Sequence, residues 1–306
     1  MFPASDKSSD IVDALIKFVK DSGVLFMRST CKGIITEDGG VLGAETDGGP
    51  IAAKSVVVAT GGTSYPLTGS TGDGYRFAAD AGHTIIGLSP SLIPIVANEP
   101  WCKELMGLSL KNVTLSLYRQ GKKKPLYSEL GEMLFTHFGI SGPLVLSASA
   151  HMRGDLNRYR LAVDLKPGLT PEQLDARLLR DFTGNLNRDF INSLGELLPR
   201  KLIPTAVKLS GIETQTKIHQ ITKEQRRGFA ALLKNLTITP KSFRPIEEAV
   251  VTSGGVKVSE VDPVTMQSKL VKGLFFAGEV LDVDAYTGGF NLQIAFSTGY
   301  LAAQNC

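Results

Sequence analysis

The chain has 306 residues, enough to bury a large core and to form two domains or one domain that carries an insertion. Its 33 basic and 30 acidic side chains leave a formal net charge of +3, which favours no acidic partner. No apolar run approaches the roughly 20 residues that a membrane span needs. Composition therefore predicts a soluble cytoplasmic protein with no nucleic-acid or membrane partner, and it leaves the oligomeric state open.

The cysteines and the basic runs add no further class of site. Cys31, Cys102 and Cys306 show neither a CxxC pair nor metal-ligand spacing, so the sequence predicts no disulfide framework and no metal site. The run Lys122-Lys123-Lys124 falls where a hairpin turn is expected and has no interleaved aromatic residues. It is typical of a solvated turn rather than of a nucleic-acid surface.

The first sixty residues predict a helix followed by short strands. Ser8 or Ser9 would cap an amphipathic helix that ends at Gly23. Apolar or alternating segments separated by Gly- and Asp-rich turns then predict an isolated strand and a small antiparallel meander. These strands are expected at residues 24–27, 33–36, 41–46 and 51–54.

Two glycine loops follow a strand that reads as buried. Val56, Val57 and Val58 are consecutive and β-branched, a pattern that predicts a parallel strand covered on both faces. The strand ends at Thr60-Gly61-Gly62, and residues 68–74 form a second glycine loop that opens a helix. Glycine lets a ligand approach the backbone at the carboxyl end of such a strand, although either loop alone is also typical of a plain turn.

The pattern changes between residues 92 and 244. Val113, Leu115 and Leu117 alternate with polar residues, which predicts a half-exposed strand, and further strands are expected at 131–136 and 159–165. Capping signals at Thr170 and Thr222 then predict two helices. This region is predicted to be an inserted domain, barrel-like in its strands and helical in its second part.

The last thirty residues, GLFFAGEVLDVDAYTGGFNLQIAFSTGYLAA, are rich in glycine and poor in charge. Leu274 to Ala277 reads as a buried strand that stops at Gly278-Glu279. A loop leads to Gly288-Gly289, and apolar residues then recur at helical spacing. The order is strand, loop, glycine turn and helix.

Together, these segments resemble a known family of flavoproteins. Two strands ending in ATGG and FAGE, separated by a large insertion, resemble the split FAD-binding domain of flavoprotein oxidoreductases. VVVATGGTSYPLTGSTGDGYRFAADAGH, GEMLFTHFGISGP and TSGGVKVSEVDPVTMQSK, with the C-terminal segment, are similar to the bacterial family of aminoacetone oxidase and the BaiN-type 3-dehydro-bile-acid reductase. The resemblance implies an α/β fold: a truncated Rossmann-like FAD-binding domain, residues 1–91 and 245–306, interrupted by a substrate or cap domain, residues 92–244.

The resemblance also implies a chemistry and a set of cofactor contacts. The reaction would be hydride transfer through flavin N5 on a small organic substrate, with NAD(P)H as a possible electron donor. Glu279 would hold the ribitol hydroxyls, and Cys31 would offer a backbone contact near the adenine side, although a small buried apolar role is the simpler explanation of this cysteine. The other expected FAD contacts are Ala59, Thr60, Gly61, Gly62, Gly278, Gly288, Gly289, Phe290, Asn291 and Leu292.

One motif of the family is not found in the 306 residues. The resemblance implies a strand–GxGxxG–helix unit for the FAD pyrophosphate, and this sequence contains none, so we expect a fragment that binds FAD weakly. Two hypotheses follow. The chain is either an FAD-dependent oxidoreductase or a non-catalytic remnant that does not hold FAD.

Acid–base residues are only weakly indicated. His137 lies beside a glycine-rich turn and could face a substrate pocket, and Tyr65 and Tyr286 flank the two glycine sites and could donate a proton. A hydrogen-bonded structural histidine and packing or cofactor-shielding tyrosines explain the same residues. The catalytic residues are therefore left open.

Overall fold

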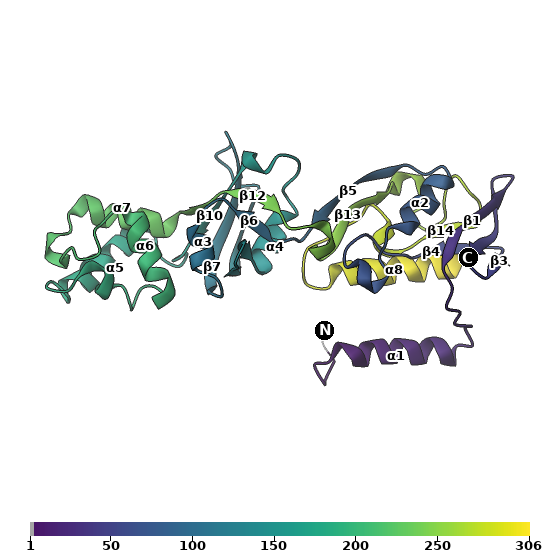
Figure 1. Ribbon diagram of the computed structural model, residues 1–306, viewed down its shortest axis with the longest axis horizontal. Coiled ribbons are helices and arrows are strands. Elements are labelled where there is room, and N and C mark those ends of the chain that lie inside the picture. Colours follow the sequence, from purple (N-terminus) through teal and green to yellow (C-terminus); the bar gives the residue numbers. More distant parts are fainter. Residues whose placement is uncertain (1–2) are drawn as a thin grey trace.

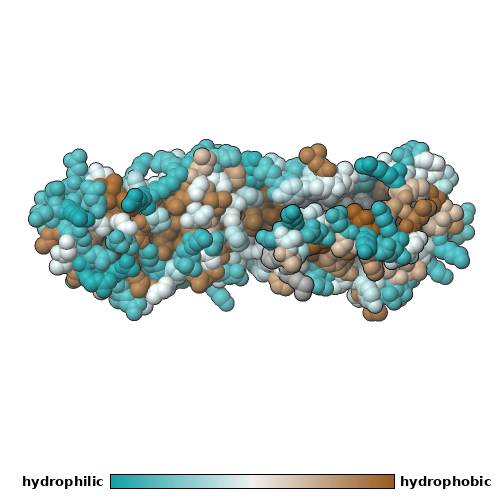
Figure 2. Space-filling model, turned by 90° about the horizontal axis from the view of Figure 1, so that it is seen from below, coloured by the Kyte–Doolittle hydropathy of each residue, from teal (hydrophilic) through white to brown (hydrophobic). Residues whose placement is uncertain are grey.

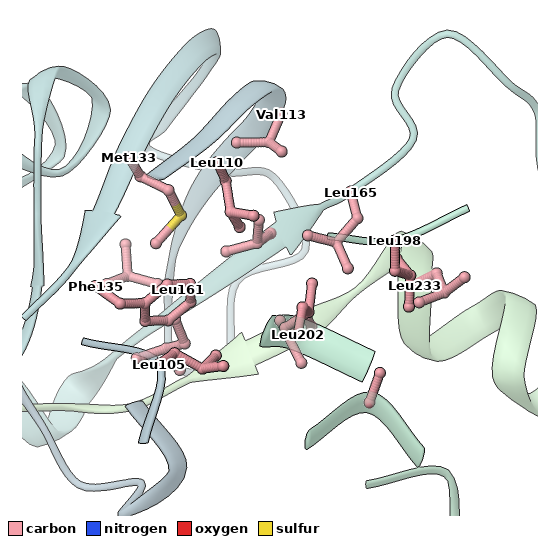
Figure 3. Packing of buried hydrophobic residues seen from close by; sticks show 14 of the residues in the cluster. Leu105, Leu110, Val113, Met133, Phe135, Leu161, Leu165, Leu198, Leu202 and Leu233 are labelled. Atoms are coloured by element: carbon pink, nitrogen blue, oxygen red, sulfur yellow. The ribbon is translucent and has the colours of Figure 1, made fainter. Parts of the chain in front are cut away.

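The computed structural model describes residues 3–306, and their buried apolar side chains form two separate clusters. One cluster spans residues 95–238, and Figure 3 shows part of it, including Leu105, Leu110 and Phe135. The other combines residues 41–78 with residues 256–302. We call the regions around them the middle lobe, residues 95–243, and the terminal lobe, residues 31–91 and 251–305. The two lobes lie end to end along the molecule (Figure 1).

The terminal lobe is built from small sheets and two helices. Its meander pairs β1 with β2 and β2 with β3, all antiparallel, β5 pairs antiparallel with β13, and β4 pairs parallel with β14. The parallel pair and the helix after each of its strands are the α/β part that the sequence predicts. The elements are β1 (Cys31–Glu37), β2 (Gly40–Thr46), β3 (Gly49–Ala52), β4 (Val56–Val58), α2 (Asp73–Asp80), β5 (Ile85–Ser91), β13 (Val251–Val256), β14 (Leu274–Phe276) and α8 (Phe290–Asn305).

The middle lobe contains one seven-stranded sheet with the order β11-β10-β7-β8-β9-β6-β12. Its edge strands β11 and β12 are consecutive in the chain, but they do not pair within residues 3–306, so the expected barrel is an unclosed sheet. The elements are β6 (Ile95–Ala97), α3 (Trp101–Glu104), β7 (Ser109–Arg119), β8 (Tyr127–Phe135), β9 (Gly139–Ser141), α4 (Pro143–Ser149), β10 (Tyr159–Asp164), α5 (Pro171–Thr183), α6 (Ile203–Ser210), α7 (Lys223–Lys234), β11 (Leu236–Ile238) and β12 (Pro240–Phe243).

Helices α5 and α7 begin where their capping signals predict. The side chain of Thr170 accepts a hydrogen bond from the Gln173 N–H, and the Gln173 side chain accepts one from the Thr170 N–H. Thr222 and Gln225 form the same reciprocal pair at the start of α7. Each box satisfies backbone donors that the first turn of a helix leaves free, which explains why the sequence fixes these two starts.

The N-terminal helix forms as predicted, but its surroundings differ. Helix α1 (Ser8–Asp21) has Lys7 rather than a serine at the N-cap position, and none of its residues is buried. The expected strand at 24–27 is wrong: residues 24–30 have no regular secondary structure, and Leu25 is 86% exposed. A strand needs a neighbour for its backbone groups, and within residues 3–306 no backbone hydrogen bond reaches residues 24–27. Figure 1 shows α1 apart from the lobes. Figure 2 views the molecule from below and shows apolar residues among polar ones on that face.

The burial expected of β4 is also corrected. Val58 is buried, but Val57 is 39% exposed. Strand β4 has a single partner, β14, in a two-stranded sheet, so it is not the fully covered strand that three consecutive valines suggested. Among the same residues, no helix has the length and apolar character that crossing a membrane requires.

A buried histidine joins α2 to the loop before β14. The Nε2 atom of His83 lies 2.7 Å from Oγ of Ser268, its Nδ1 atom lies 3.4 Å from a carboxylate oxygen of Glu260, and its ring packs edge-on against Phe276. Burial lowers the pKa of His83 below 6.5, and the negative charge of Glu260 opposes this effect. Lys257 faces the same carboxylate at 3.7 Å.

We expect the protein to lose stability as the pH falls below about 6.5, the ordinary pKa of histidine. Because the folded-state pKa of His83 is lowered, the unfolded chain takes up the proton first, and acid therefore favours unfolding. Urea unfolding at pH 7.5 and at pH 5.5 measures the effect. The loss should shrink in His83→Gln and persist in the exposed control His219→Gln, and an equal loss in both variants would contradict the assignment.

Candidate functional site

Three segments of the terminal lobe meet at the carboxyl ends of β4 and β14. The N–H of Ala277 donates to the carbonyl of Val58 at 3.1 Å and extends the parallel pairing beyond the strands. Residues 59–64 then turn away from β4, and residues 278–280 form a short 3-10 helix after β14. Strand β13 completes the group from the side. Carboxyl ends of parallel strands are where open α/β sheets hold ligands.

Thr252 of β13 links these segments. Its buried Oγ1 accepts a hydrogen bond from the Thr63 N–H at 2.8 Å and lies 3.1 Å from Oγ of Ser64. Its own N–H donates to Oε1 of Glu279 at 2.8 Å. The backbone of Gly62 passes so close that a Cβ there would clash with both Thr252 and Glu279. Glycine is therefore favoured at position 62 because a larger residue would collide with these side chains, and not because of an unusual φ angle.

Only one of the two carboxylate oxygens of Glu279 accepts a hydrogen bond from the described residues. Oε1 accepts from Thr252, whereas no donor in residues 3–306 reaches Oε2. Burial and, secondly, the charge of Glu279 raise the pKa of the nearby Tyr75 to about 12, so this phenol stays protonated at neutral pH. Within the described chain, the buried hydroxyls of Tyr75 and Thr60 have no hydrogen-bond partner. Orphaned polar atoms are rare in folded proteins and suggest a missing partner.

Helix α8 begins beside this group with an open end. Gly288 and Gly289 have φ of +112° and +89°, conformations that favour glycine, and Gly289 is the N-cap without a side-chain hydrogen bond. No atom lies within 4 Å of the place where a Cβ of Gly289 would stand. The first N–H groups of a helix lack partners within it and carry a partial positive charge. This end can therefore accept an electron-rich ligand edge.

The other predicted residues of α8 have separate roles. The side chain of Asn291 accepts from the Ala285 N–H at 2.9 Å and donates to the Ala285 carbonyl at 2.8 Å, so it holds the preceding loop. Phe290 and Leu292 are 58% and 63% exposed. The Gly278 N–H donates to Oγ1 of Thr298 at 2.9 Å, which fixes the end of β14 against α8.

A pocket of about 600 Å³ lies where the start of α8 faces the middle lobe. The middle lobe contributes the turn after α4, and the terminal lobe contributes the loop at 284–286 and the first turns of α8. Its walls are mostly apolar with a few polar groups, the composition expected of a small-molecule site. The lining residues are Ala150, His151, Arg153, Asp284, Ala285, Tyr286, Phe290, Gln293 and Ile294.

The sequence analysis missed most of the polar residues of this pocket. The hydroxyl of Tyr286 makes a short hydrogen bond with Nε2 of His151, and the His151 ring packs between Tyr286 and Tyr127, with centroids 5.5 and 5.4 Å away. Asp284 accepts hydrogen bonds from the hydroxyls of Ser91 and Ser253. His151 and Tyr286 are 135 residues apart, and no local pattern connects them.

The remaining candidates lie elsewhere. Tyr65 is 53% exposed, has φ of +49°, and donates its N–H to the Glu247 carbonyl. His137 is exposed in the turn before β9 and does not line the pocket. Cys31 is in β1, and its thiol lies 3.5 Å from the Gly33 carbonyl, within the meander. The predicted residues therefore lie at two places. Tyr286 and Phe290 line the pocket. The residues at the ends of β4 and β14 are Thr60, Gly61, Gly62, Gly278 and Glu279.

Comparison with protein families identifies the family of the chain. The family model described as the HI0933-like protein Rossmann domain matches residues 1–305. The chain therefore belongs to the HI0933-like family of FAD-dependent Rossmann proteins.

Curated relatives carry two different names. The chain is 29% identical to the 3-dehydro-bile acid delta(4,6)-reductase of Clostridium scindens, over 99% of this chain and 74% of that protein. It is 28% identical to the ribosomal RNA dihydrouridine synthase of Escherichia coli, over 98% and 72%. The Haemophilus influenzae protein of the same name is 33% identical over 82% of this chain and 59% of its own length.

Two solved structures of Aquifex aeolicus GidA are similar over most of the chain. In crystal forms II and I they share 16% and 15% identity, with TM-scores of 0.34 and 0.35, and cover 94% and 96% of this chain. The chain spans about half the length of GidA, 46% and 50%.

The residues present suit the flavin end of FAD. The free Oε2 of Glu279 is an acceptor for hydroxyl groups, and the uncapped start of α8 has open space in front of Gly289. The orphaned hydroxyls of Tyr75 and Thr60 add polar atoms without protein partners. FAD would supply redox chemistry here, and the chain would supply orientation and charge.

Proposed function

We propose that the chain forms the flavin-contacting part of an FAD-dependent oxidoreductase that reduces or oxidises a small organic substrate by hydride transfer at flavin N5. The proposal rests mainly on one observation: β4, β13 and β14 meet around Glu279, and no donor in the described residues reaches its Oε2. The open start of α8 supports the proposal independently. Membership of the HI0933-like family gives the cofactor class.

Each group in the site has a role under this proposal. Glu279 accepts hydrogen bonds from the ribitol hydroxyls. The N–H groups at the start of α8 stabilise negative charge at the N1/O2 edge of the ring, because the helix end is positive. Gly61 and Gly62 let the backbone lie against the middle of the cofactor, because glycine has no side chain to stand between the backbone and a ligand.

The substrate side of the proposal rests on the pocket between the lobes. Relatives are named for a bile acid and for ribosomal RNA, so the names alone do not select a substrate class. A pocket of about 600 Å³ with mainly apolar walls favours a small organic molecule. Residues 92–244 form the proposed cap that chooses it, and a reduced nicotinamide cofactor is the proposed electron donor.

We expect Glu279→Ala to weaken FAD binding by about 1–3 kcal/mol, roughly 5- to 150-fold in Kd, since hydrogen bonds to a charged acceptor have this size. Titration of the 306-residue chain with FAD, followed by flavin fluorescence, measures the change. Glu279→Gln keeps an oxygen for the Thr252 N–H and separates the loss of charge from a loss of fold. Exposed Glu213→Ala is the matched control.

The same titration separates the two hypotheses. Weak but saturable binding with a perturbed flavin spectrum supports the oxidoreductase. An affinity of Glu279→Ala equal to that of the parent would remove Glu279 from the site, and no binding at millimolar FAD would favour a remnant that no longer holds the cofactor.

A further inference from the structure

The pocket between the lobes contains a pair of side chains that the cofactor does not require. Tyr286 comes from the terminal lobe and His151 from the turn after α4, and the short hydrogen bond between them crosses the boundary of the lobes. Both residues line the pocket. The walls next to them are apolar, with Phe290 and Ile294 on α8 and Ala150 opposite.

Stacking holds the pair in place. The imidazole of His151 lies between the rings of Tyr127 and Tyr286, at centroid distances of 5.4 and 5.5 Å. The hydroxyl of Tyr127 donates to Glu129 at 3.2 Å. The ring planes are tilted by 38° and 45°, and this packing on both sides restricts His151, which binds the Tyr286 hydroxyl.

Burial, more than the nearby charges, favours the neutral form of both members. Burial and, secondly, the charge of Glu129 raise the pKa of Tyr286, and burial and, secondly, Arg153 lower the pKa of His151, with Glu129 acting in the opposite direction. Arg153 donates to Oγ of Ser253, whose hydroxyl donates to Asp284, so these two charges offset each other. The groups facing the pair are therefore Tyr127, Glu129, Arg153 and Asp284.

A neutral tyrosine and a neutral histidine each carry one polar hydrogen, and the hydrogen bond between them uses only one of the two. If Nε2 of His151 carries its proton, it donates to the Tyr286 oxygen and leaves the phenol O–H free to point elsewhere. A ligand oxygen that accepts a hydrogen bond selects this tautomer. As negative charge grows on that oxygen, the O–H donor becomes more strongly bound, which is the principle of an oxyanion site.

We propose that Tyr286 and His151 form a hydrogen-bond and proton donor for a carbonyl or enolate oxygen of a small organic substrate in this pocket. This inference rests on the proposed function. The proton moves from the Tyr286 hydroxyl to the substrate oxygen, and the phenolate regains a proton from water through His151. Tyr286 is the catalytic residue and His151 its positioning residue.

The test uses 4-nitrophenol, because its phenolate resembles an enolate and absorbs visible light, and it needs no flavin. We expect the 306-residue chain to bind it saturably and Tyr286→Phe to weaken binding about 10- to 100-fold. His151→Phe keeps a ring in the stack and should cause a smaller loss. Tyr300→Phe, at an exposed tyrosine of α8, and His219→Gln should change nothing.

A second readout separates donation from packing. A donor stabilises the phenolate, so the pKa of bound 4-nitrophenol should be higher in Tyr286→Phe than in the parent. A weaker affinity with an unchanged pKa of the probe would overturn the proposal and leave Tyr286 as a packing residue. Full affinity in Tyr286→Phe would do the same.

Competition with FAD distinguishes the two proposals. If FAD and 4-nitrophenol bind together, the pocket is a substrate site as proposed. If FAD displaces the probe, the pocket is the flavin site itself and the donor proposal is wrong, although the proposed function stands. If FAD does not bind while the Tyr286-dependent binding of the probe persists, the proposed function fails and the donor pair is retained.

Discussion

Phe276→Ala is expected to lower the free energy of unfolding of the terminal lobe by about 3–5 kcal/mol, the usual cost of removing a buried phenylalanine ring. Phe276 is fully buried in β14, and its ring packs against His83 with centroids 4.9 Å apart. The cavity would open within β14, the strand that leads to Glu279. Urea unfolding followed by near-ultraviolet circular dichroism measures the loss.

Phe229→Ala is the matched variant in the middle lobe, where Phe229 is 1% exposed and lies 5.1 Å from the ring of Phe190. We expect two unfolding transitions, each shifted by only one variant, because the apolar clusters are separate. This outcome would support the proposal that residues 92–244 are an insertion. One transition shifted equally by both variants would show a single cooperative unit.

Gly62→Ala is expected to lower stability by about 1–3 kcal/mol through overpacking and to weaken FAD binding as well. The new methyl group would clash with the side chain of Thr252 and lie 2.5 Å from Oε1 of Glu279, so both must move. Thermal unfolding and FAD titration together measure the effect. Gly33→Ala, where no atom lies within 4 Å of the added group, is the control. A stable variant with normal FAD affinity would contradict the arrangement around Glu279.

Local signals predicted the elements whose ends are fixed by neighbouring residues. Thr170 and Thr222 begin their helices with capping boxes, and the turn at Asp38-Gly39 joins β1 to β2 as expected. Gly289 could also be placed before α8 from the local sequence, because the turn there requires a φ of +89°, which favours glycine. Interactions over three or four residues determine these features, so a single sequence contains them.

Features that depend on distant partners could not be predicted. Val24 to Met27 has the composition of a strand but no backbone hydrogen-bond partner within residues 3–306, and Val57 is exposed. Strand β13 was missed because Gly254 and Gly255 interrupt its pattern, although it pairs with β5. Thr252 and Glu279 could be placed together only once this pairing was known.

The same limit applies to the candidate site. Glu279 and the glycine turns were predicted through the family resemblance. His151 was not predicted, because it lies in the pocket only through the packing of the two lobes. The sequence around His151 contains no motif that marks it as a partner of Tyr286. Only the contact between chain segments 135 residues apart distinguishes it from a structural histidine.

The chain enters and leaves the middle lobe at one place. Strand β6 pairs with β12, Ile95 opposite Phe243, and the Arg244 N–H donates to the Pro94 carbonyl at 3.2 Å. Two adjacent strands therefore carry the chain between the lobes, and each apolar cluster lies on one side of this connection. The hydrogen bonds from His151 to Tyr286 and from Arg153 to Ser253 cross the same boundary. The relative position of the two lobes therefore decides whether the proposed donor pair is formed.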